Sequence, residues 1–259
     1  MLTLFRLAFA PPRDLILLLA AGWIGLILSE KRARNSGFQV KMLDNLVFIL
    51  TIAFRIGGRL FFAAEHFSIF AQNPASLISL NISLFDSWGG LAAAGIAGFV
   101  FGQGDKLELG TTLDMLTPLF AVLAVGLGLS HLASGAAYGK ETDMPWAWYE
   151  WGANRHPTQI YEIVAALLTL GLIWFYKGNF KPGGNFLFFI ALASGSRLII
   201  EAFRGDSTLI IGGLRAAQIV AWITLALSLL GMELIVFPRP PTFQQQKDPH
   251  SDKRKAGKK

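Results

Sequence analysis

Three charged side chains in an otherwise apolar stretch are the residues of this chain best suited to chemistry. Arg197, Glu201 and Arg204 lie in the segment GSRLIIEAFRGD, residues 195–206, within a hydrophobic run that begins near Phe186. Their i, i+4, i+7 spacing places all three on one face of a helix. A charged side chain far inside a bilayer costs roughly 2.5 to 3.5 kcal/mol even on lenient insertion scales. We therefore expect this face to turn inward and meet a partner, either an anionic ligand or another part of the protein.

The composition is that of a polytopic membrane protein. Of the 259 residues, 53% are hydrophobic and only 15% are charged, which is more apolar than a soluble domain requires. Cysteine is absent, which excludes disulfides, thiolate metal sites and a thiol nucleophile supplied by this chain. If a thiol takes part in the reaction, the substrate must bring it.

Several common kinds of enzyme site lack support in the sequence. It contains no GxSxG nucleophile motif, no glycine-lysine pattern of a phosphate-binding loop and no histidine pair at metal-ligand spacing. We expect no metal ion, no cofactor and no nucleic-acid partner.

The hydropathy pattern predicts an all-α fold with about seven transmembrane helices in a lipid bilayer. The expected spans are residues 15–28, 43–64, 91–101, 113–132, 160–176, a run from residue 186 through the charged face, and 216–237. The segment KRARNSG is expected to be a loop between the first two spans, and residues 133–157 are expected to be a long loop before the fifth.

The same pattern divides the chain into two parts. Residues 1–240 are expected to form the seven-span domain. Pro238, Pro240 and Pro241 end its last helix, because proline cannot continue a helix. Residues 241–259 are polar and basic, and we expect them to form a disordered cytoplasmic tail.

The basic residues predict how the spans are oriented. One set of loops, together with the tail, carries most of them, whereas the other set holds Arg6, Arg13, Lys140, Arg155, Arg204 and Arg215. By the positive-inside rule the N-terminus faces out and the C-terminus lies in the cytoplasm. The charged face, His131 at the end of the fourth span and His156 at the start of the fifth then lie towards the outer leaflet. A site there would meet lipid head groups and exported polypeptides.

Several motifs together resemble the prolipoprotein diacylglyceryl transferase family. The most specific is RHPTQIYE at residues 155–162, which carries the string HP-x-Q-x-YE between two spans. The others are SHLASGAAYGKETDMPW before it, SRLIIEAFRGD after it, RIGGRLFF at 55–62 and WGGL at 88–91. With the seven-span layout, the resemblance covers most of the chain.

The resemblance implies a multi-pass enzyme of the bacterial inner membrane. Such enzymes transfer the diacylglyceryl group of phosphatidylglycerol to the thiol of a lipobox cysteine in an exported precursor protein, and they release glycerol phosphate. The absence of cysteine here is compatible with this reaction, because the nucleophile belongs to the precursor.

The resemblance also implies roles for individual residues. An arginine of the charged face would hold the lipid phosphate, to which its planar guanidinium can donate two hydrogen bonds. The catalytic group is expected to hold His156, Tyr161, Glu201 and His131, and the substrate-binding group Arg197, Arg204, Arg59, Arg55, Gln159 and Glu162. Gly135 and Gly139 match glycines of the family signature.

The chain departs from the family pattern in the signature segment. The family reads approximately GR-x-GNF-x-NGE, whereas Gly128, His131, Ser134 and Ala136 stand here in place of the arginine, the two asparagines and the glutamate. Trp88 replaces the histidine of an HGG motif, and Ala193 replaces a tyrosine. His131 can supply the general base that Trp88 cannot.

The sequence leaves structural explanations open for the same residues. Arg197 and Glu201 are spaced as an intrahelical i, i+4 pair, and Arg204 can extend to the interface. His156 precedes a proline at a helix start, where it can cap or orient the loop.

Other polar and aromatic residues also have structural alternatives. Arg55 and Arg59 lie one turn apart and repel each other unless they share an anion or pair with Glu65 or Glu201. Asp114 suits the electrostatics of a helix start. The tryptophans of the 133–157 loop are typical of an interfacial aromatic belt.

Two other functions remain open at this level. One is a non-catalytic relative that binds anionic phospholipid or an exported peptide in the same cavity. The other is a small-molecule carrier whose arginines bind an anion, although the sequence has no visible inverted repeat.

Overall fold

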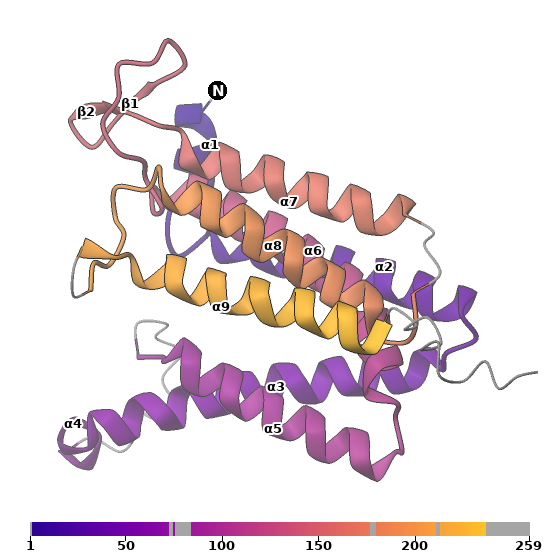
Figure 1. Ribbon diagram of the computed structural model, residues 1–259. Coiled ribbons are helices and arrows are strands. Elements are labelled where there is room, and N and C mark those ends of the chain that lie inside the picture. The colour runs from indigo at the N-terminus through magenta and orange to yellow at the C-terminus, as the bar shows by residue number, and fades with distance from the viewer. Residues whose placement is uncertain (1, 73–74, 76–83, 177–179, 211–212, 237–259) are drawn as a thin grey trace, which may run out of the picture.

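The helices of the protein run alongside one another in two groups (Figure 1). The computed structural model describes residues 2–72, 75, 84–176, 180–210 and 213–236. The larger group contains α2 (Leu15–Asn35), α6 (Leu109–Ser134), α7 (Thr158–Phe175), α8 (Gly184–Glu201) and α9 (Ala216–Gly231). The smaller contains α3 (Val40–Glu65), the short α4 (Phe67–Gln72) and α5 (Ser87–Gly104). The tail expected at 241–259 lies outside the described residues.

Five helices in the described part of the chain are long and apolar enough to cross a membrane. They are α3, α6, α7, α8 and α9 with its extension, Ala216–Ile235, which ends in the π-helical turn η3 (Met232–Val236). This confirms a helical membrane protein. The remaining two expected spans coincide with α2 and α5, so the count of seven stays a prediction.

The KRARNSG segment was expected to be a loop, and this prediction was wrong for most of its length. Helix α2 continues through Arg34 to Asn35. Arg34 Nη2 contacts Glu30 Oε2 at 2.6 Å, an i, i+4 pair that supports the helix. Basic side chains in the last turn also interact favourably with the helix dipole. The polarity of this segment therefore marks the end of the apolar run, not the end of the helix.

Helices α2 and α6 pack closely along their length. The side-chain oxygen of Ser29 on α2 accepts a hydrogen bond from the backbone N–H of Leu119 at 3.1 Å, next to Pro118 inside α6. Small residues and buried hydroxyls of this kind are common where membrane helices meet, because the lipid tails provide no hydrophobic driving force. This contact fixes the position of α6, whose far end carries His131.

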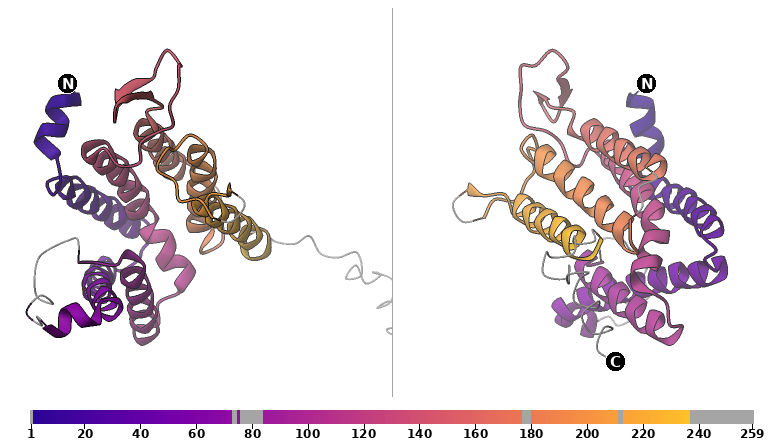
Figure 2. Two further views of the ribbon diagram at one scale, coloured as in Figure 1. Left: turned by 90° about the vertical axis from the view of Figure 1, so that its left-hand side faces the viewer. Right: turned by 45° about the vertical axis from the view of Figure 1, so that its right-hand side comes forward.

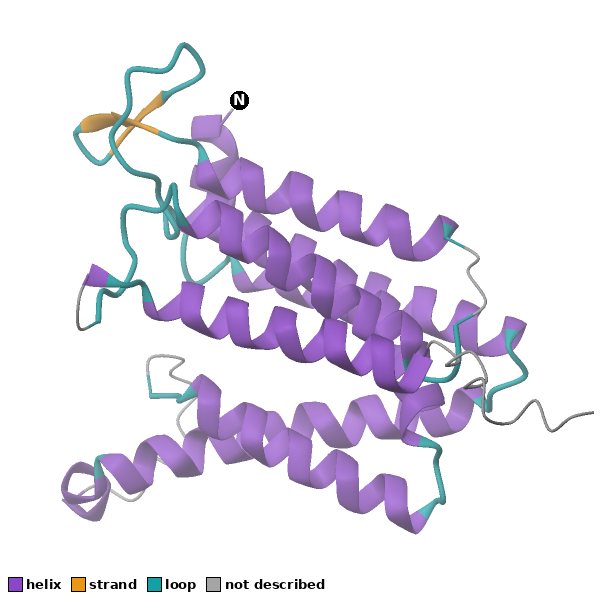
Figure 3. Ribbon diagram, in the orientation of Figure 1, coloured by secondary structure: helices purple, strands orange, loops and turns teal. Residues whose placement is uncertain are grey.

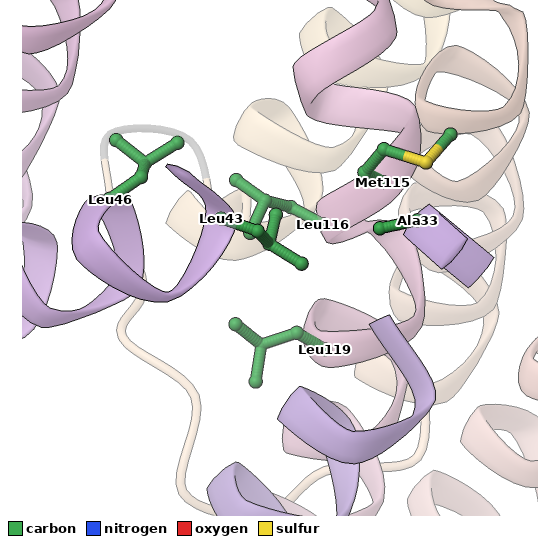
Figure 4. Packing of buried hydrophobic residues seen from close by; sticks show 6 residues of the cluster. All are labelled: Ala33, Leu43, Leu46, Met115, Leu116 and Leu119. Atoms are coloured by element: carbon green, nitrogen blue, oxygen red, sulfur yellow. The ribbon is translucent and has the colours of Figure 1, made fainter. Parts of the chain in front are cut away.

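The two helix groups meet at a small apolar cluster (Figure 4). It consists of Ala33 of α2, Leu43 and Leu46 of α3, and Met115, Leu116 and Leu119 of α6. Elsewhere the groups diverge, and the end-on view in Figure 2 shows α3 and α5 apart from α7, α8 and α9. Within the smaller group, Gly89 of the WGGL segment lets α5 approach α3, because an added Cβ would lie 2.2 Å from Phe61 Cβ.

One end of the larger group carries the loop before α7 and the only strands among the described residues (Figure 3). The antiparallel hairpin of β1 (Trp148–Glu150) and β2 (Ala153–Arg155) interrupts the expected 133–157 loop. Trp151 and Gly152 connect the strands with φ of 49° and 80°, as in the type I′ turn that suits two-residue hairpins. Helix α1 (Leu2–Phe9) lies at this end too (Figure 1).

Candidate active site

The centre of the candidate site is the carboxylate of Glu162, near the start of α7. Its Oε1 accepts hydrogen bonds from Arg197 Nη1 and Arg204 Nη1, both at 3.0 Å. Its Oε2 lies 2.7 Å from His131 Nδ1. The Glu162 side chain is only 12% exposed. One carboxylate thus joins the C-terminal end of α6, the N-terminal end of α7 and the C-terminal end of α8.

Arg204 is held firmly by two carboxylates. Its Nε and Nη2 donate to the two oxygens of Asp206, both at 2.9 Å, in a fork-to-fork pair. Its remaining Nη1 donates to Glu162, and the side chain is 11% exposed. Burial lowers the pKa of the Arg204 guanidinium, but the carboxylates of Asp206, Glu162 and Glu201 outweigh it and raise the pKa above its ordinary value. Arg204 therefore stays charged and fixed.

Arg197 is held less completely. Its Nη2 lies 2.9 Å from Glu201 Oε2, which is the intrahelical pair that its spacing allows, and its Nη1 reaches Glu162. Its side chain remains 37% exposed, whereas that of Glu201 is 1% exposed. Glu201 Oε2 accepts no hydrogen bond of good geometry within the described part of the chain. A guanidinium has five N–H donors, so Arg197 can still take a further acceptor.

His156 and Tyr161 form a second pair beside this cluster. Tyr161 Oη lies 3.4 Å from His156 Nδ1 and accepts a hydrogen bond from Trp146 Nε1 at 2.8 Å. The His156 ring also meets the Phe203 ring edge-on at 5.1 Å between centroids. The pair therefore connects the loop before α7 with the turn after α8.

Gln159 lies in the interior, where it holds the loop. It is fully buried, and its Nε2 donates to the carbonyl of Ala136 at 3.0 Å and to Glu150 Oε2 at 3.2 Å. Arg6 of α1 donates to the other oxygen of Glu150 and to the carbonyl of Leu132. The contacts give Gln159 a positioning role, and its expected contact with substrate stays a prediction.

Backbone segments cross closely at the N-terminal end of α7 and the C-terminal end of α8. Lys140 N donates to Phe203 O at 2.8 Å, and His156 N donates to Lys140 O at 3.0 Å. Gly139 lies at this crossing, where an added Cβ would lie 2.2 Å from the carbonyl oxygen of His156. Gly135 ends α6 with φ of 72°, a conformation that glycine adopts without strain. Close backbone packing therefore explains glycine at position 139, and the positive φ explains glycine at position 135.

Comparison with known proteins identifies the family of this chain. The family model of prolipoprotein diacylglyceryl transferase matches residues 15–234. The chain belongs to this family. Phosphatidylglycerol–prolipoprotein diacylglyceryl transferase of Bordetella bronchiseptica is 25% identical over 254 residues, which cover 86% of this chain and 94% of that protein.

Two further relatives carry the same name. The protein of a Nostoc species is 26% identical over 244 residues, covering 87% of this chain and 86% of that protein. The protein of Clostridioides difficile is 28% identical over 210 residues, covering 80% of this chain and 84% of that protein.

The positions at which this prolipoprotein diacylglyceryl transferase family member departs from the family pattern lie in different surroundings. Gly128, in place of the signature arginine, faces Ile163 of α7, so that α6 and α7 pack closely there. Ser134 borders a cavity of about 330 Å³ on the side of α6 that faces Arg6. Trp88 is exposed at the start of α5. Only His131 among these replacements contacts Glu162 in the described part of the chain.

The structure does not bring Arg55 and Arg59 to the Glu162 cluster. Both lie on α3 in the smaller helix group (Figure 1). Arg59 Nη1 donates to the carbonyl of Leu84 at 2.6 Å, and its guanidinium lies 5.9 Å from the Phe70 ring centroid. Arg55 is exposed. Their substrate-binding role in this family member stays a prediction.

Sequence reasoning missed two residues that order the site. Asp206 fixes Arg204 and also accepts a hydrogen bond from Ala137 N at 3.1 Å. Arg215 Nη1 donates to the carbonyls of Glu201 and Arg204 and so fixes the turn after α8. The i, i+2 spacing of Arg204 and Asp206 could have suggested the first, whereas no local signal indicates the second.

Proposed function

We propose that this protein transfers the diacylglyceryl group of phosphatidylglycerol to the lipobox cysteine of exported precursor proteins in the bacterial inner membrane. Membership of the family, with three relatives named for this reaction, supports the proposal. The observation that carries it for this chain is Arg197, a partly exposed guanidinium that two carboxylates orient.

In the proposed reaction the precursor thiol loses its proton, and its sulfur attacks the glyceryl carbon that bears the phosphate. The carbon–oxygen bond breaks, its electron pair stays on the phosphate oxygen, and the lost proton returns there, so that glycerol phosphate leaves. Arg197 donates hydrogen bonds to the phosphate and stabilises the charge that develops on the leaving group. Glu201 orients Arg197, and His156 with Tyr161 contacts the substrate beside it.

The arrangement in the membrane is part of the proposal. Helices α2 and α5 complete a seven-span domain over residues 1–240, with the N-terminus outside and residues 241–259 in the cytoplasm as a tail. The excess of basic residues at the other end supports this orientation. It places the Glu162 cluster in the outer leaflet, within reach of a lipid head group and an exported peptide.

The test is transfer of labelled diacylglyceryl from phosphatidylglycerol to a lipobox peptide by the purified protein, with a Cys→Ser peptide as control. Arg197→Ala should reduce transfer by about 100-fold or more, the range seen when one charge-stabilising donor is removed. Arg197→Lys should restore only part, because the planar fork is lost. Arg34→Ala is the matched control, because Arg34 lies in the last turn of α2, at the end of the bundle away from the Glu162 cluster (Figure 1). This variant should transfer normally. Unchanged binding of phosphatidylglycerol by Arg197→Ala would contradict the assignment.

A further inference from the structure

Glu162 uses its two oxygens for different partners. Oε1 serves two arginines, whereas Oε2 is in contact with His131 at 2.7 Å. We propose that Glu162 is a positioning residue that holds His131 as the general base for the thiol and links this base to phosphate capture at Arg197. The inference rests on the proposed function, since it assigns the proton transfer of that reaction.

The contact determines which ring nitrogen of His131 is free. An ionised carboxylate only accepts hydrogen bonds, so the nitrogen that faces it, Nδ1, carries the proton. In the neutral ring Nε2 then holds the lone pair. The same logic applies in serine hydrolases, where a carboxylate fixes the tautomer of the histidine base. The His131 ring is partly exposed, so Nε2 can receive a proton from outside the cluster.

The proton transfer is balanced within the proposed reaction. His131 Nε2 takes the S–H proton, and the imidazolium that forms is stabilised by Glu162. The thiolate forms the carbon–sulfur bond while the carbon–oxygen bond to the phosphate breaks. His131 then returns its proton to the departing phosphate oxygen, so no other acid or reactant is needed.

The unequal hold on the two arginines supplies the link to lipid binding. Arg204 has a fork-to-fork pair with Asp206, whereas Arg197 has no such pair and is more exposed. An arriving phosphate therefore binds Arg197 in competition with the carboxylates of Glu162 and Glu201. As Arg197 turns to the phosphate, Arg204 becomes the only arginine among the described residues that is paired with Glu162. More of the negative charge of the carboxylate is then available to stabilise the His131 imidazolium that forms during the reaction.

Two charged groups contact the chain neighbours of His131: Asp14 Oδ2 accepts a hydrogen bond from Ser130 Oγ at 2.9 Å, and Arg6 Nε donates to Leu132 O at 3.0 Å. The other charged groups near His131 in the described residues act through Glu162. Glu162 contributes from α7, Arg197 and Glu201 from α8, and Arg204 with Asp206 from the turn that follows. With Arg197 drawn to the phosphate, Glu162 has one cation fewer as a partner, and its hydrogen bond with His131 Nδ1 strengthens. The base is thus held more firmly once the lipid has bound, which couples thiol activation to the loaded enzyme.

The alternative is that His131 merely replaces an asparagine of the family pattern and keeps a structural contact. His131→Asn separates the two roles, because an amide can still donate a hydrogen bond to Glu162 but cannot take a proton at neutral pH. If His131 is the base, transfer by His131→Asn should fall by about 100-fold or more. Wild-type transfer by this variant would overturn the assignment.

The test of Glu162 combines transfer with a spectroscopic readout in the full-length protein. With ¹⁵N-histidine label, the ring signals of His131 are identified by their loss in His131→Asn. We expect the Nδ1–H form in the wild type, and a downfield move of the Nδ1–H signal on adding phosphatidylglycerol as its hydrogen bond to Glu162 strengthens. Glu162→Gln should lose that response and about 100-fold of transfer, while Glu162→Asp should regain part of both. Full transfer and an unchanged response in Glu162→Gln would overturn the proposal.

Arg197→Ala provides an independent check of the link. Without lipid, its His131 signals should move in the same direction as those of the wild type with phosphatidylglycerol, because one of the two cations on Glu162 is gone. Unmoved signals would overturn the link. If the wild type transfers nothing, the proposed function fails, yet these signals still decide whether Glu162 couples His131 to phosphate binding. Thermal unfolding of each variant identifies any change that only reflects misfolding, and Glu162→Asp then provides the deciding comparison.

Discussion

Asp114 on α6 caps a helix other than its own: its Oδ1 accepts a hydrogen bond at 2.9 Å from the backbone N–H of Phe186, in the first turn of α8. Its Oδ2 accepts another at 2.9 Å from Gly183 N. The first N–H groups of a helix have no partner within it. Asp114 therefore fixes the start of the helix whose other end carries Arg197 and Glu201.

Replacement of Asp114 should destabilise the protein without touching the Glu162 cluster. Asp114→Ala leaves two partly buried N–H donors at the start of α8 unpaired and should cost about 1 to 2 kcal/mol of unfolding free energy. Asp114→Asn should cost less, because the amide oxygen still accepts. Asp143→Ala, at an exposed acidic residue, is the control and should stay within about 0.5 kcal/mol. Unfolding in detergent measures all three, and equal midpoints for Asp114→Ala and wild type would contradict the capping role.

The crossing at Gly139 should not accept a side chain. In Gly139→Ala the new Cβ meets the carbonyl of His156, so the backbone must shift and the hydrogen bonds of Lys140 weaken. We expect the unfolding free energy to fall by about 1 to 3 kcal/mol. Diacylglyceryl transfer should also fall, since Arg204 lies on the segment that faces Gly139. Gly95→Ala is the control because open space surrounds an added Cβ there. Its helix should be as stable or more so, by up to about 1 kcal/mol.

Replacement of the buried Gln159 should mainly lower the stability of the protein and have a smaller effect on substrate binding. Gln159→Ala removes the hydrogen bonds to Ala136 and Glu150 and should cost about 1 to 3 kcal/mol. Gln159→Glu should cost more, because it places a second carboxylate beside Glu150. The measurements are the unfolding midpoint and the KM for phosphatidylglycerol. A raised KM with an unchanged midpoint would instead support the substrate contact expected from the sequence.

The sequence sufficed for the long apolar helices and for the helical face that carries Arg197 and Glu201, but not for the hairpin, the short helices α1 and α4 or the end of α2. The i, i+4 spacing put Arg197 and Glu201 on one helical face, whereas Arg204, expected on the same face, lies beyond the end of α8 in the turn that follows. The alternating direction of the spans placed His131 and His156 at the same end of the bundle as this face. These features follow from helical periodicity and hydropathy, which are local.

The contacts between helices could not be predicted in the same way. Whether Gln159 turns towards Glu150, and whether Asp114 caps α8, depends on the rotation of each helix about its axis. That rotation is set by contacts between distant segments, such as Ser29 with Leu119. The same limitation explains Arg55 and Arg59, whose helix packs in the other group.

Arg6 and Glu150 should prove strongly coupled in a double-mutant cycle. Glu150 is buried, and Arg6 of α1 donates to its Oε1 while Trp148 and Gln159 donate to Oε2. Arg6→Ala leaves a buried carboxylate without its cation and should cost about 2 kcal/mol or more. In a Glu150→Gln background the same change should cost much less, which gives a coupling of about 1 to 3 kcal/mol. Arg13→Ala, whose side chain is exposed and bonds only Leu7 O in the described residues, is the control. Additive effects of Arg6→Ala and Glu150→Gln would show that α1 docks independently of the hairpin.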